Sequence, residues 1–377
     1  MGLVKDIESY LTDKFSRKYC IFTGSGTTAL YLLLKSLKLK EGDTVLLPGI
    51  CCFSVAYAVK YAGLKLDFCD VSINDACLST DALEASIKHN PSIKVVIGVH
   101  LYGNVLDMDS IMKICKKHRI VFIEDVCQAY GSYYKNRPCG SFGDYSILSF
   151  GHTKILDNGH GGAVLTDNSQ DVEMIRNQFD KLISYDKQEH DKLSSNHRDR
   201  YYKLQALSRN NAAKVVLFEK LLKGFMENFI HGIDYSSLKG LKILLKKEEK
   251  IIVHRIKLYK LYKTTLIENQ GIRFIGSDHK IVPWRFSFLI PYVNTFRLCD
   301  TLRNEGFDIS TWYPNLANMF VSDNKRKLKN ANIIENSVVN FWVDDTKNEK
   351  DVVNICSRIL ELNNDKRYQI GTNKYIA

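Results

Sequence analysis

The residues from Ser149 to Thr166 are of types that could act on a carbonyl compound. Lys154 stands five residues after Ser149, and a Gly-His-Gly-Gly turn at 159–162 leads from it into an apolar run. A lysine amine that is partly desolvated and close to other cations loses its proton more easily, and it can then form a Schiff base with an aldehyde. Taken alone, Lys154 would more often be one of the exposed lysines of a lysine-rich chain. Its chemistry therefore depends on the residues that the fold brings to it.

A glycine-rich turn near the N-terminus is a second candidate for chemistry. The turn Gly24–Thr28 follows an apolar run, Tyr19–Thr23, and precedes a strongly helical run, Ala29–Leu37. A strand, turn and helix in this order present free backbone N–H groups and a positive helix end at Gly26 and Thr27, which could hold a phosphate. The same pattern is often only a turn, so it needs support from other residues.

An acidic residue and an amide follow another apolar run. Asp125 comes directly after the predicted strand Ile120–Glu124, and Gln128 follows three residues later. In an open α/β sheet, ligands bind at the carboxyl ends of the strands. Pyridoxal phosphate (PLP) is an aldehyde that needs both a phosphate cradle and an anion beside its protonated pyridine nitrogen. Asp125 could be that anion, with Gln128 on the ring oxygen, or Asp125 could cap the following turn.

The elements that must position these residues alternate between strand and helix through the first half of the chain. This alternation predicts the α/β class, with a mostly parallel, doubly wound sheet. We expect strands at Tyr19–Thr23, Thr44–Leu47, Lys65–Cys69, Lys94–His100, Ile120–Glu124, Asp144–Phe150 and Gly161–Thr166, and helices at 4–15, Ala29–Leu37, Ser54–Tyr61, Thr80–Lys88 and Met108–Lys116. The glycine turn, Asp125, Ser149 and Lys154 then all lie at strand ends.

The second half predicts two long helices and a smaller α+β domain. We expect helices at Asn211–Ile230, Glu248–Ile267, Thr295–Glu305 and Glu349–Leu362, and strands at Trp284–Ile290 and Val338–Trp342. The polar stretch Ile183–Arg200 predicts a long loop at the mouth of the active site. We divide the chain into a large PLP-binding domain, residues 1–245, and a small domain, residues 246–377.

Composition excludes several classes of protein. The net charge is +11, but the basic residues are scattered and no nucleic-acid motif accompanies them, so we expect no nucleic-acid partner. The ten cysteines show no Cys-x-x-Cys spacing, which predicts reduced thiols and no metal site. No run of about 18 apolar residues and no signal peptide is visible, so we expect no membrane span and a cytoplasmic location.

Together these motifs resemble the DegT/StrS family of PLP-dependent sugar aminotransferases, in the fold-type-I aspartate aminotransferase superfamily. The likeness rests on Ser25-Gly26-Thr27 with Ala29-Leu30, His100–Gly103, Glu124-Asp125 with Gln128-Ala129 and Gly131, Gly143-Asp144, Ser149-Phe150, Thr153-Lys154 and Gly161–Ala163. It covers residues 5–168 and continues more faintly to about residue 362. The resemblance implies a mostly parallel seven-stranded central sheet with helices on both faces, and a homodimer whose subunits share the active site.

The resemblance also implies the role of each cofactor-binding residue. Lys154 would carry PLP as a Schiff base, Asp125 would pair with the pyridine nitrogen, and Gln128 would contact the ring oxygen. The hydroxyl of Ser149 and the backbone of Gly26-Thr27 would hold the phosphate. Family members with histidine in place of the lysine are sugar 3-dehydratases, so Lys154 favours transamination.

The chain departs from the family pattern at three places. The family's ring-stacking aromatic falls at Cys52, so either Cys52 covers the ring or Phe53 replaces the aromatic. The acidic residue usual before the paired glycines is His160, which could titrate near neutral pH or serve as a plain loop residue. The Gly-x-Asn-x-Arg stretch that reaches the neighbouring subunit's cofactor phosphate is not visible, and Arg209 or Asn210 could substitute for it.

By resemblance, the reaction is transamination from an amino acid, glutamate, to a keto group of a nucleotide-linked deoxysugar, for surface polysaccharide or glycan synthesis. Trp312 and Tyr313 would contact the substrate, although an aromatic pair is as often core packing. Two alternatives remain. The acceptor could be a small phosphorylated ketone or a keto sugar acid, because the phosphate-binding stretch is altered, or the chain could be a non-catalytic homologue with a regulatory or binding role.

Overall fold

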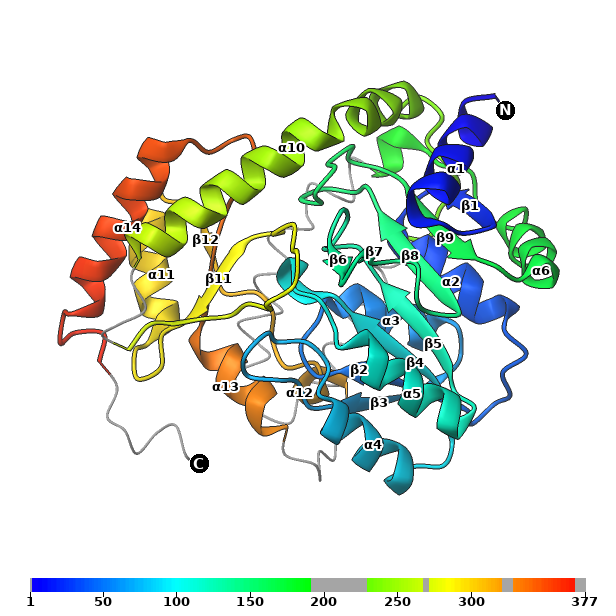
Figure 1. Ribbon diagram of the computed structural model, residues 1–377, viewed down its shortest axis with the longest axis horizontal. Coiled ribbons are helices and arrows are strands. Elements are labelled where there is room, and N and C mark those ends of the chain that lie inside the picture. Colours follow the sequence, from blue (N-terminus) through cyan, green and yellow to red (C-terminus); the bar gives the residue numbers. More distant parts are fainter. Residues whose placement is uncertain (1, 191–228, 267–270, 321–327, 370–377) are drawn as a thin grey trace.

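The computed structural model describes residues 2–190, 229–266, 271–320 and 328–369. The chain folds into a seven-stranded sheet and a separate four-stranded sheet, which the long helix α10 (Leu238–Thr265) connects (Figure 1). A short hairpin of β6 (Tyr133–Tyr134) and β7 (Arg137–Pro138) lies apart from both sheets. No helix within the described ranges is long and apolar enough to cross a membrane.

The large sheet has the strand order β1-β9-β8-β5-β4-β2-β3. Its strands are β1 (Tyr19–Thr23), β2 (Thr44–Pro48), β3 (Lys65–Cys69), β4 (Ile93–Val99), β5 (Val121–Asp125), β8 (Tyr145–Ser149) and β9 (Gly162–Thr166). Strand β9 runs antiparallel to both of its neighbours, and the other neighbouring pairs are parallel. The predicted mostly parallel α/β sheet is therefore confirmed.

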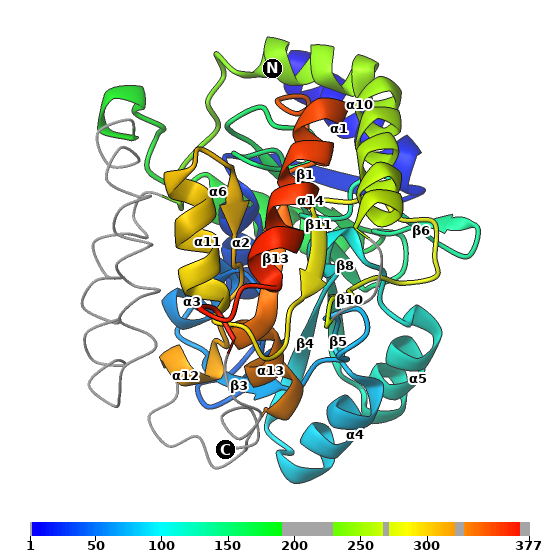
Figure 2. The ribbon, with the colours of Figure 1, turned by 90° about the vertical axis from the view of Figure 1, so that its left-hand side faces the viewer.

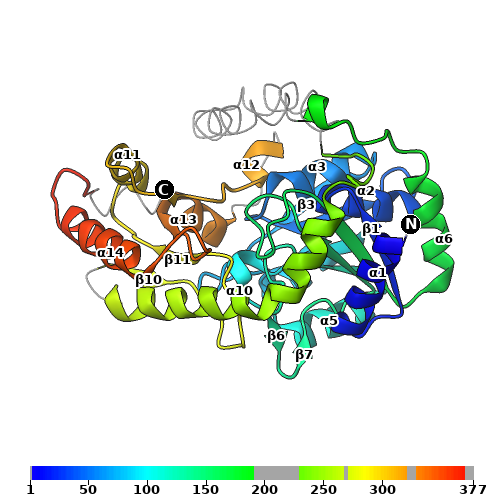
Figure 3. The same cartoon turned by 90° about the horizontal axis from the view of Figure 1, so that it is seen from above.

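The strands of this sheet are nearly continuous apolar runs because both of its faces are covered. Side chains of Val45 and Leu47 join one core cluster, and the intervening Leu46 joins the other. Figure 3 shows α2 (Gly26–Ser36) and α3 (Phe53–Tyr61) on one side of the sheet, with α1 (Gly2–Phe15) and α5 (Met108–His118) on the opposite side. The remaining helices of this part are η1 (Leu101–Gly103), α4 (Thr80–His89) and α6 (Ser169–Phe179).

The small sheet is antiparallel, with the order β10-β11-β13-β12 (Figure 2). Its strands are β10 (Arg273–Phe274), β11 (Phe286–Leu289), β12 (Ile309–Ser310) and β13 (Val338–Phe341), and its helices are α11 (Thr295–Asn304), α12 (Ala317–Phe320), α13 (Lys329–Ser337) and α14 (Glu349–Asn363). Leu258 and Tyr262 of α10 belong to the core of this sheet, whereas Leu241 and Leu245 belong to a core of the large sheet. The predicted boundary between residues 245 and 246 falls within α10, and the division into two domains stays a prediction.

Two expectations about the second half need correction. Helix α10 begins at Leu238, ten residues before the predicted start at Glu248. The predicted loop Ile183–Arg200 is irregular at 183–186 but helical at 187–190, and its remainder lies outside the described residues. Most of the predicted helix Asn211–Ile230 also lies outside them, and its last two residues form a turn.

Candidate active site

Four chain segments meet at one edge of the large sheet because of the strand register. Thr23 at the end of β1 pairs with Gly162, and Gly162 pairs with Ser149 at the end of β8. Strand β5 runs parallel to β8 and ends nearby at Asp125. The glycine turn after Thr23, the lysine loop after Ser149 and the Asp125 carboxylate therefore lie along the same carboxyl edge, as the sequence predicted.

The glycine turn approaches Ser149 closely. Ser25 caps α2 by accepting a 2.9 Å hydrogen bond from the Thr28 N–H. The N–H groups of Gly26 and Thr27 belong to the first turn, where an α-helix offers no internal acceptor. A Cβ atom at Gly26 would lie 2.8 Å from Ser149 Cβ and 3.2 Å from Ser149 Oγ. Two backbone donors and a hydroxyl thus face the same space, which suits a phosphate and leaves no room for a side chain at Gly26.

The Asp125 carboxylate is buried, with 5% of the residue exposed. Its Oδ1 accepts a 2.9 Å hydrogen bond from the Cys127 N–H, so the predicted alternative that it caps the following turn is correct. A carboxylate has two oxygens and can accept further hydrogen bonds, so this cap does not prevent a second contact with a protonated ring nitrogen.

The charges of Asp125 and Lys154 both act on the Cys127 thiol. Burial raises the pKa of this thiol well above its ordinary value; the negative charge of Asp125 raises it further, and the positive charge of Lys154 lowers it. Opposite charges from the end of β5 and from the loop after β8 therefore act on one side chain. The predicted roles of Lys154 and Asp125 at a cofactor stay predictions.

The backbone of the lysine loop is held by residues from the far end of the sequence. The buried guanidinium of Arg255, on α10, donates to the Lys154 carbonyl at 3.3 Å and to the Trp284 carbonyl at 3.1 Å. The Trp284 indole N–H donates to the Thr153 carbonyl. Neither Arg255 nor Trp284 stood out in the sequence, because isolated residues within an amphipathic helix and an apolar strand carry no motif.

The Gln128 amide is bonded within the protein. Its Oε1 accepts a 2.9 Å hydrogen bond from the Tyr102 N–H, and its Nε2 donates to the Tyr313 hydroxyl at 2.9 Å. A second Nε2–H remains for another acceptor, since a carboxamide nitrogen carries two hydrogens. The predicted contact of Gln128 with a cofactor ring oxygen stays a prediction.

Aromatic rings from both sheets stack beside Gln128. The centroids of Tyr102, Trp284 and Tyr313 lie 5.9–6.3 Å apart, and their planes differ by 17–18°. Tyr313 is buried at 4% exposure, which matches the alternative that it packs in the core, whereas Trp312 is partly exposed. Arg285, a residue that the sequence did not single out, lies 4.0 Å from the Trp284 ring centroid.

Cys52 and Phe53 differ in their surroundings. Phe53 is 3% exposed and packs in the core, whereas Cys52 caps the start of α3 and is partly exposed. The Cys52 sulfur lies 3.0 Å from the Ser54 hydroxyl oxygen. Which of the two residues covers the cofactor ring stays a prediction.

The remaining candidates for substrate contact are His160, Arg209 and Asn210. His160 is partly buried beside Tyr185, whose hydroxyl lies 3.2 Å from His160 Nε2. Burial lowers the pKa of His160 below its ordinary value of 6.5. Arg209 and Asn210 lie outside the described residues.

The model of the DegT/DnrJ/EryC1/StrS aminotransferase family matches residues 3–221, more than half of the chain. The chain belongs to this family. Among curated members that it resembles, GDP-perosamine synthase of Caulobacter vibrioides is 33% identical over 165 residues, 44% of each chain. The L-glutamine:2-deoxy-scyllo-inosose aminotransferase of Streptoalloteichus tenebrarius is 34% identical over 152 residues, 40% of this chain and 35% of that enzyme. The chain thus spans less than half the length of these relatives.

Solved structures of other proteins share the fold over nearly the whole chain. DesI, solved with its TDP-sugar product, has a TM-score of 0.78 at 18% identity and covers 97% of this chain and 86% of its own. The GDP-4-keto-6-deoxy-D-mannose-3-dehydratase of E. coli, solved with hydrated PLP, has a TM-score of 0.72 at 19% identity, with 95% and 91% covered. The predicted family and fold are confirmed, and PLP is confirmed as the cofactor of the family.

Proposed function

We propose that the protein is a PLP-dependent aminotransferase that moves an amino group from glutamate to a keto group of a nucleotide-linked deoxysugar. The observation that carries this proposal is the strand register, which brings Asp125 at the end of β5 and the lysine loop after Ser149 of β8 to one edge of the large sheet. The Gly26 turn and Ser149 lie at the same sheet edge, ready for a phosphate. These are the three groups that a PLP site requires: an amine, an anion and a phosphate cradle.

The residues present fit the cofactor. When bound, PLP supplies an aldehyde that takes up the amino group and a ring that withdraws electrons from the reacting carbon. The Lys154 amine acts as general base and acid, since it takes the proton from the donor's α-carbon and returns it to a neighbouring carbon. Asp125 keeps a proton on the ring nitrogen, and Ser149 with the Gly26-Thr27 backbone binds the phosphate.

The rest of the site orients these groups. Arg255 fixes the carbonyl of Lys154, which limits the positions that the amine can reach. Cys52 covers the space beside Asp125, where an aromatic residue stands in the family pattern. Trp312, which is partly exposed and lies beside Tyr313, contacts the acceptor, and buried Tyr313 is held by a hydrogen bond from Gln128.

The choice of acceptor rests on the relatives. Those named GDP-perosamine synthase, and DesI with its TDP-sugar, act on or bind nucleotide-linked sugars. The aminotransferases named for L-glutamine and 2-deoxy-scyllo-inosose indicate a second candidate, transfer from glutamine to a cyclic ketone without a nucleotide. With the first candidate we also propose that the protein is a cytoplasmic homodimer and that its product is used in polysaccharide synthesis.

Absorbance spectroscopy tests the proposal. The purified protein with PLP should show a visible absorbance band that Lys154→Ala lacks, and glutamate should bleach the band. Glutamine in parallel separates the two donors, and GDP- and TDP-linked 4-keto-6-deoxy sugars against 2-deoxy-scyllo-inosose separate the acceptors, with amine products measured by mass spectrometry. A protein that develops no band with PLP and responds to neither donor would instead be a non-catalytic homologue.

A further inference from the structure

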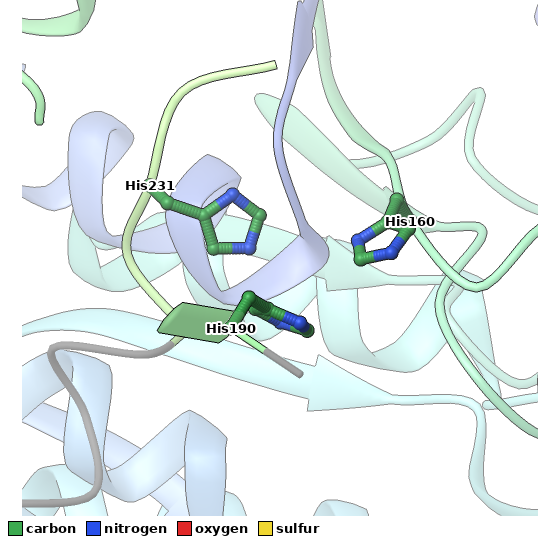
Figure 4. Close-up of side chains that lie close together, drawn as sticks. All are labelled: His160, His190 and His231. Carbon is green, nitrogen blue, oxygen red and sulfur yellow. The ribbon is translucent and has the colours of Figure 1, made fainter. Parts of the chain in front are cut away.

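Three histidines from distant parts of the sequence converge beside the glycine turn (Figure 4). His160 precedes β9, His190 lies beyond α6, and His231 precedes α10. One ring nitrogen of each lies within 4.8 Å of a ring nitrogen of both others. The ring centroids are 5.0 Å apart for His160 and His190, 5.3 Å for His190 and His231, and 6.3 Å for His160 and His231.

These separations are close to those of a three-histidine metal site. A tetrahedral Zn²⁺ with Zn–N distances of about 2.0–2.1 Å holds its ligand nitrogens about 3.4 Å apart and its imidazole centroids about 5 Å apart. Two of the three centroid separations already have this value. The third needs a shift of about one ångström, which side-chain rotation can supply.

The tautomer of His231 suits a metal ligand. His231 Nδ1 lies 2.8 Å from the Gly232 carbonyl oxygen, which can only accept, so Nδ1 carries the proton and Nε2 presents its lone pair. Neutral imidazoles are ligands for metals but do not supply the positive charge that a phosphate would need.

The surroundings fix the rings and offer a fourth ligand. The Tyr185 ring lies 5.0–5.3 Å from all three imidazoles, and its hydroxyl is 3.2 Å from His160 Nε2. The backbone N–H of His231 donates to the Thr28 hydroxyl oxygen at 3.2 Å, which ties this residue to α2. The negative charge of Asp234 acts on both His160 and His231 and would offset part of a cation's charge, although Lys187 opposes it at His160.

A second convergent group, His100, Glu124 and Cys139, lacks these properties. Both oxygens of Glu124 already accept backbone N–H groups, from Gly140, Phe142 and Gly143. His100 is likewise committed, because its Nδ1 accepts the Leu106 N–H and its Nε2 bonds to Glu124. The His100 nitrogens and the Glu124 oxygens are thus occupied by each other and by the backbone.

We propose that His160, His190 and His231 bind one divalent transition-metal ion of the zinc class, with water or the Tyr185 hydroxyl in the fourth position. An all-imidazole set favours Zn²⁺, Co²⁺, Ni²⁺ or Cu²⁺ over Mg²⁺ and Ca²⁺, which prefer oxygen ligands. The metal joins the segments at 185–190 and 229–232 to the turn that precedes Gly161. This site shares none of the residues that the proposed function assigns to the cofactor or the acceptor, although the sequence made His160 a candidate for substrate contact.

The closeness of the site to the glycine turn gives the metal a structural role. A Cβ atom at Gly24 would lie 2.5 Å from His231 Nδ1, and Ser25 forms a β-bridge with Gly161. A metal that holds His231 against His160 therefore also holds the Gly24 turn in place. The expected consequence is that metal raises the melting temperature and protects the segment from Tyr185 to His190 against proteolysis.

Cobalt binding tests the proposal on protein without a histidine tag. Addition of Co²⁺ should give intense visible bands of tetrahedral Co²⁺ that saturate at one equivalent, and Zn²⁺ should abolish them. His190→Gln and His231→Gln should each weaken Co²⁺ binding by more than about 100-fold, since loss of an outer-shell partner alone costs about 10- to 100-fold. His89→Gln, at an exposed position on α4, is the matched control and should bind normally.

Two further comparisons keep the result interpretable. Because His231 packs against the Gly24 turn, circular dichroism must show that His231→Gln is folded, and His190→Gln provides the same test at a less buried position. Lys154→Ala should bind Co²⁺ like the parent protein even if transamination fails. Absence of the tetrahedral bands in the parent, or equal losses in His89→Gln and His190→Gln, would overturn the proposal.

Discussion

The imidazole of His100 and the carboxylate of Glu124 form a 3.0 Å hydrogen bond with both side chains fully buried. His100 follows β4 directly, and its backbone N–H donates to the Asp125 carbonyl at 3.1 Å. Glu124 further accepts N–H groups from the turn at 140–143. This buried network fixes the end of β5 at the point where Asp125 enters the candidate active site.

Glu124→Gln should destabilise the protein without changing its shape. The amide nitrogen of glutamine would face backbone N–H groups, leaving donors opposite donors in a buried place. Hydrogen bonds to a charged group contribute about 1.5–3 kcal/mol, so we expect the free energy of unfolding to fall by about 2–3 kcal/mol. Urea unfolding measures this loss, and Glu361→Gln, an exposed position on α14, is the control. An unfolding midpoint equal to the parent's would contradict the role given to Glu124.

The lowered pKa of the Glu124 carboxyl predicts that the protein loses stability in acid. Burial alone raises the pKa of Glu124, but the hydrogen bond and charge of His100 and the N–H groups of Gly140 and Gly143 outweigh it, so the pKa lies below its ordinary value of 4.5. A lowered carboxyl pKa stabilises the fold above the ordinary value, and this stability is lost as the pH falls through the folded value. Unfolding measured from about pH 6 to pH 3 should therefore depend on pH more steeply in the parent than in Glu124→Gln. Parallel curves would exclude this explanation.

Gly26→Ala should weaken cofactor binding because the new Cβ meets Ser149 Cβ at 2.8 Å. The Ser149 side chain must move away from the helix start, which removes a hydroxyl from the phosphate. A cost of 1.4 kcal/mol corresponds to a factor of about ten, so we expect the Kd for PLP to rise by about tenfold or more. Gly2→Ala, at the start of α1 with nothing within 4 Å, should bind PLP normally. Titration followed by absorbance compares the two variants.

Asp125→Asn should slow the reaction while preserving the local turn. Asparagine keeps the Oδ1 that accepts the Cys127 N–H but loses the charge for the ring nitrogen. A hydrogen bond to a charged group contributes about 1.5–3 kcal/mol, so the half-reaction with glutamate should slow by about 10- to 100-fold. Stopped-flow absorbance measures this rate, and Asp107→Asn, which alters the cap of α5, is the control. A rate like the parent's would remove Asp125 from the mechanism.

Arg255→Lys should lower turnover through the lysine loop. A single ammonium cannot reach the Lys154 and Trp284 carbonyls together as the guanidinium does. Because misplacement of a catalytic group by about 1 Å can cost about 100-fold, we expect kcat to fall by about 10- to 100-fold. The KM should stay nearly unchanged, because Arg255 holds backbone. Arg358→Lys, an exposed arginine that pairs with Glu305, should have normal kinetics, and a rise confined to KM would refute a positioning role.

The strands of the large sheet could be predicted closely because each is a short, buried apolar run between turn residues. The bounds of Tyr19–Thr23 and Lys65–Cys69 agree with the structure, and the register then places Asp125 and Ser149 at one edge. Helix α13 could not be predicted, because its sequence is rich in asparagine, a poor helix former. The carboxylate of Asp70 accepts the N–H groups of Asn330 and Ala331 at its start, so a residue far away in the sequence caps it.

Candidate site residues could be named from the sequence where they belong to a motif within one segment. Residues that meet only through contacts between distant segments could not be named. Lys154, Asp125 and the Gly26 turn belong to local motifs. Arg255 acts on Lys154 from the other half of the chain, and the three histidines come together only through the fold. The absence of cysteine motifs predicted no metal site, and that reasoning did not consider histidines scattered over three segments.

The course of α10 links the two halves of the molecule mechanically (Figure 3). Its first turns pack on α1, its last turns pack in the core of the small sheet, and Arg255 lies between these ends. A helix fixed at both ends moves as a rod, so any tilt of the small sheet is transmitted along it. Such a tilt must either move the backbone of Lys154 as well or break the hydrogen bonds of Arg255. The position of the amine therefore depends on the small sheet as well as on the loop that carries it.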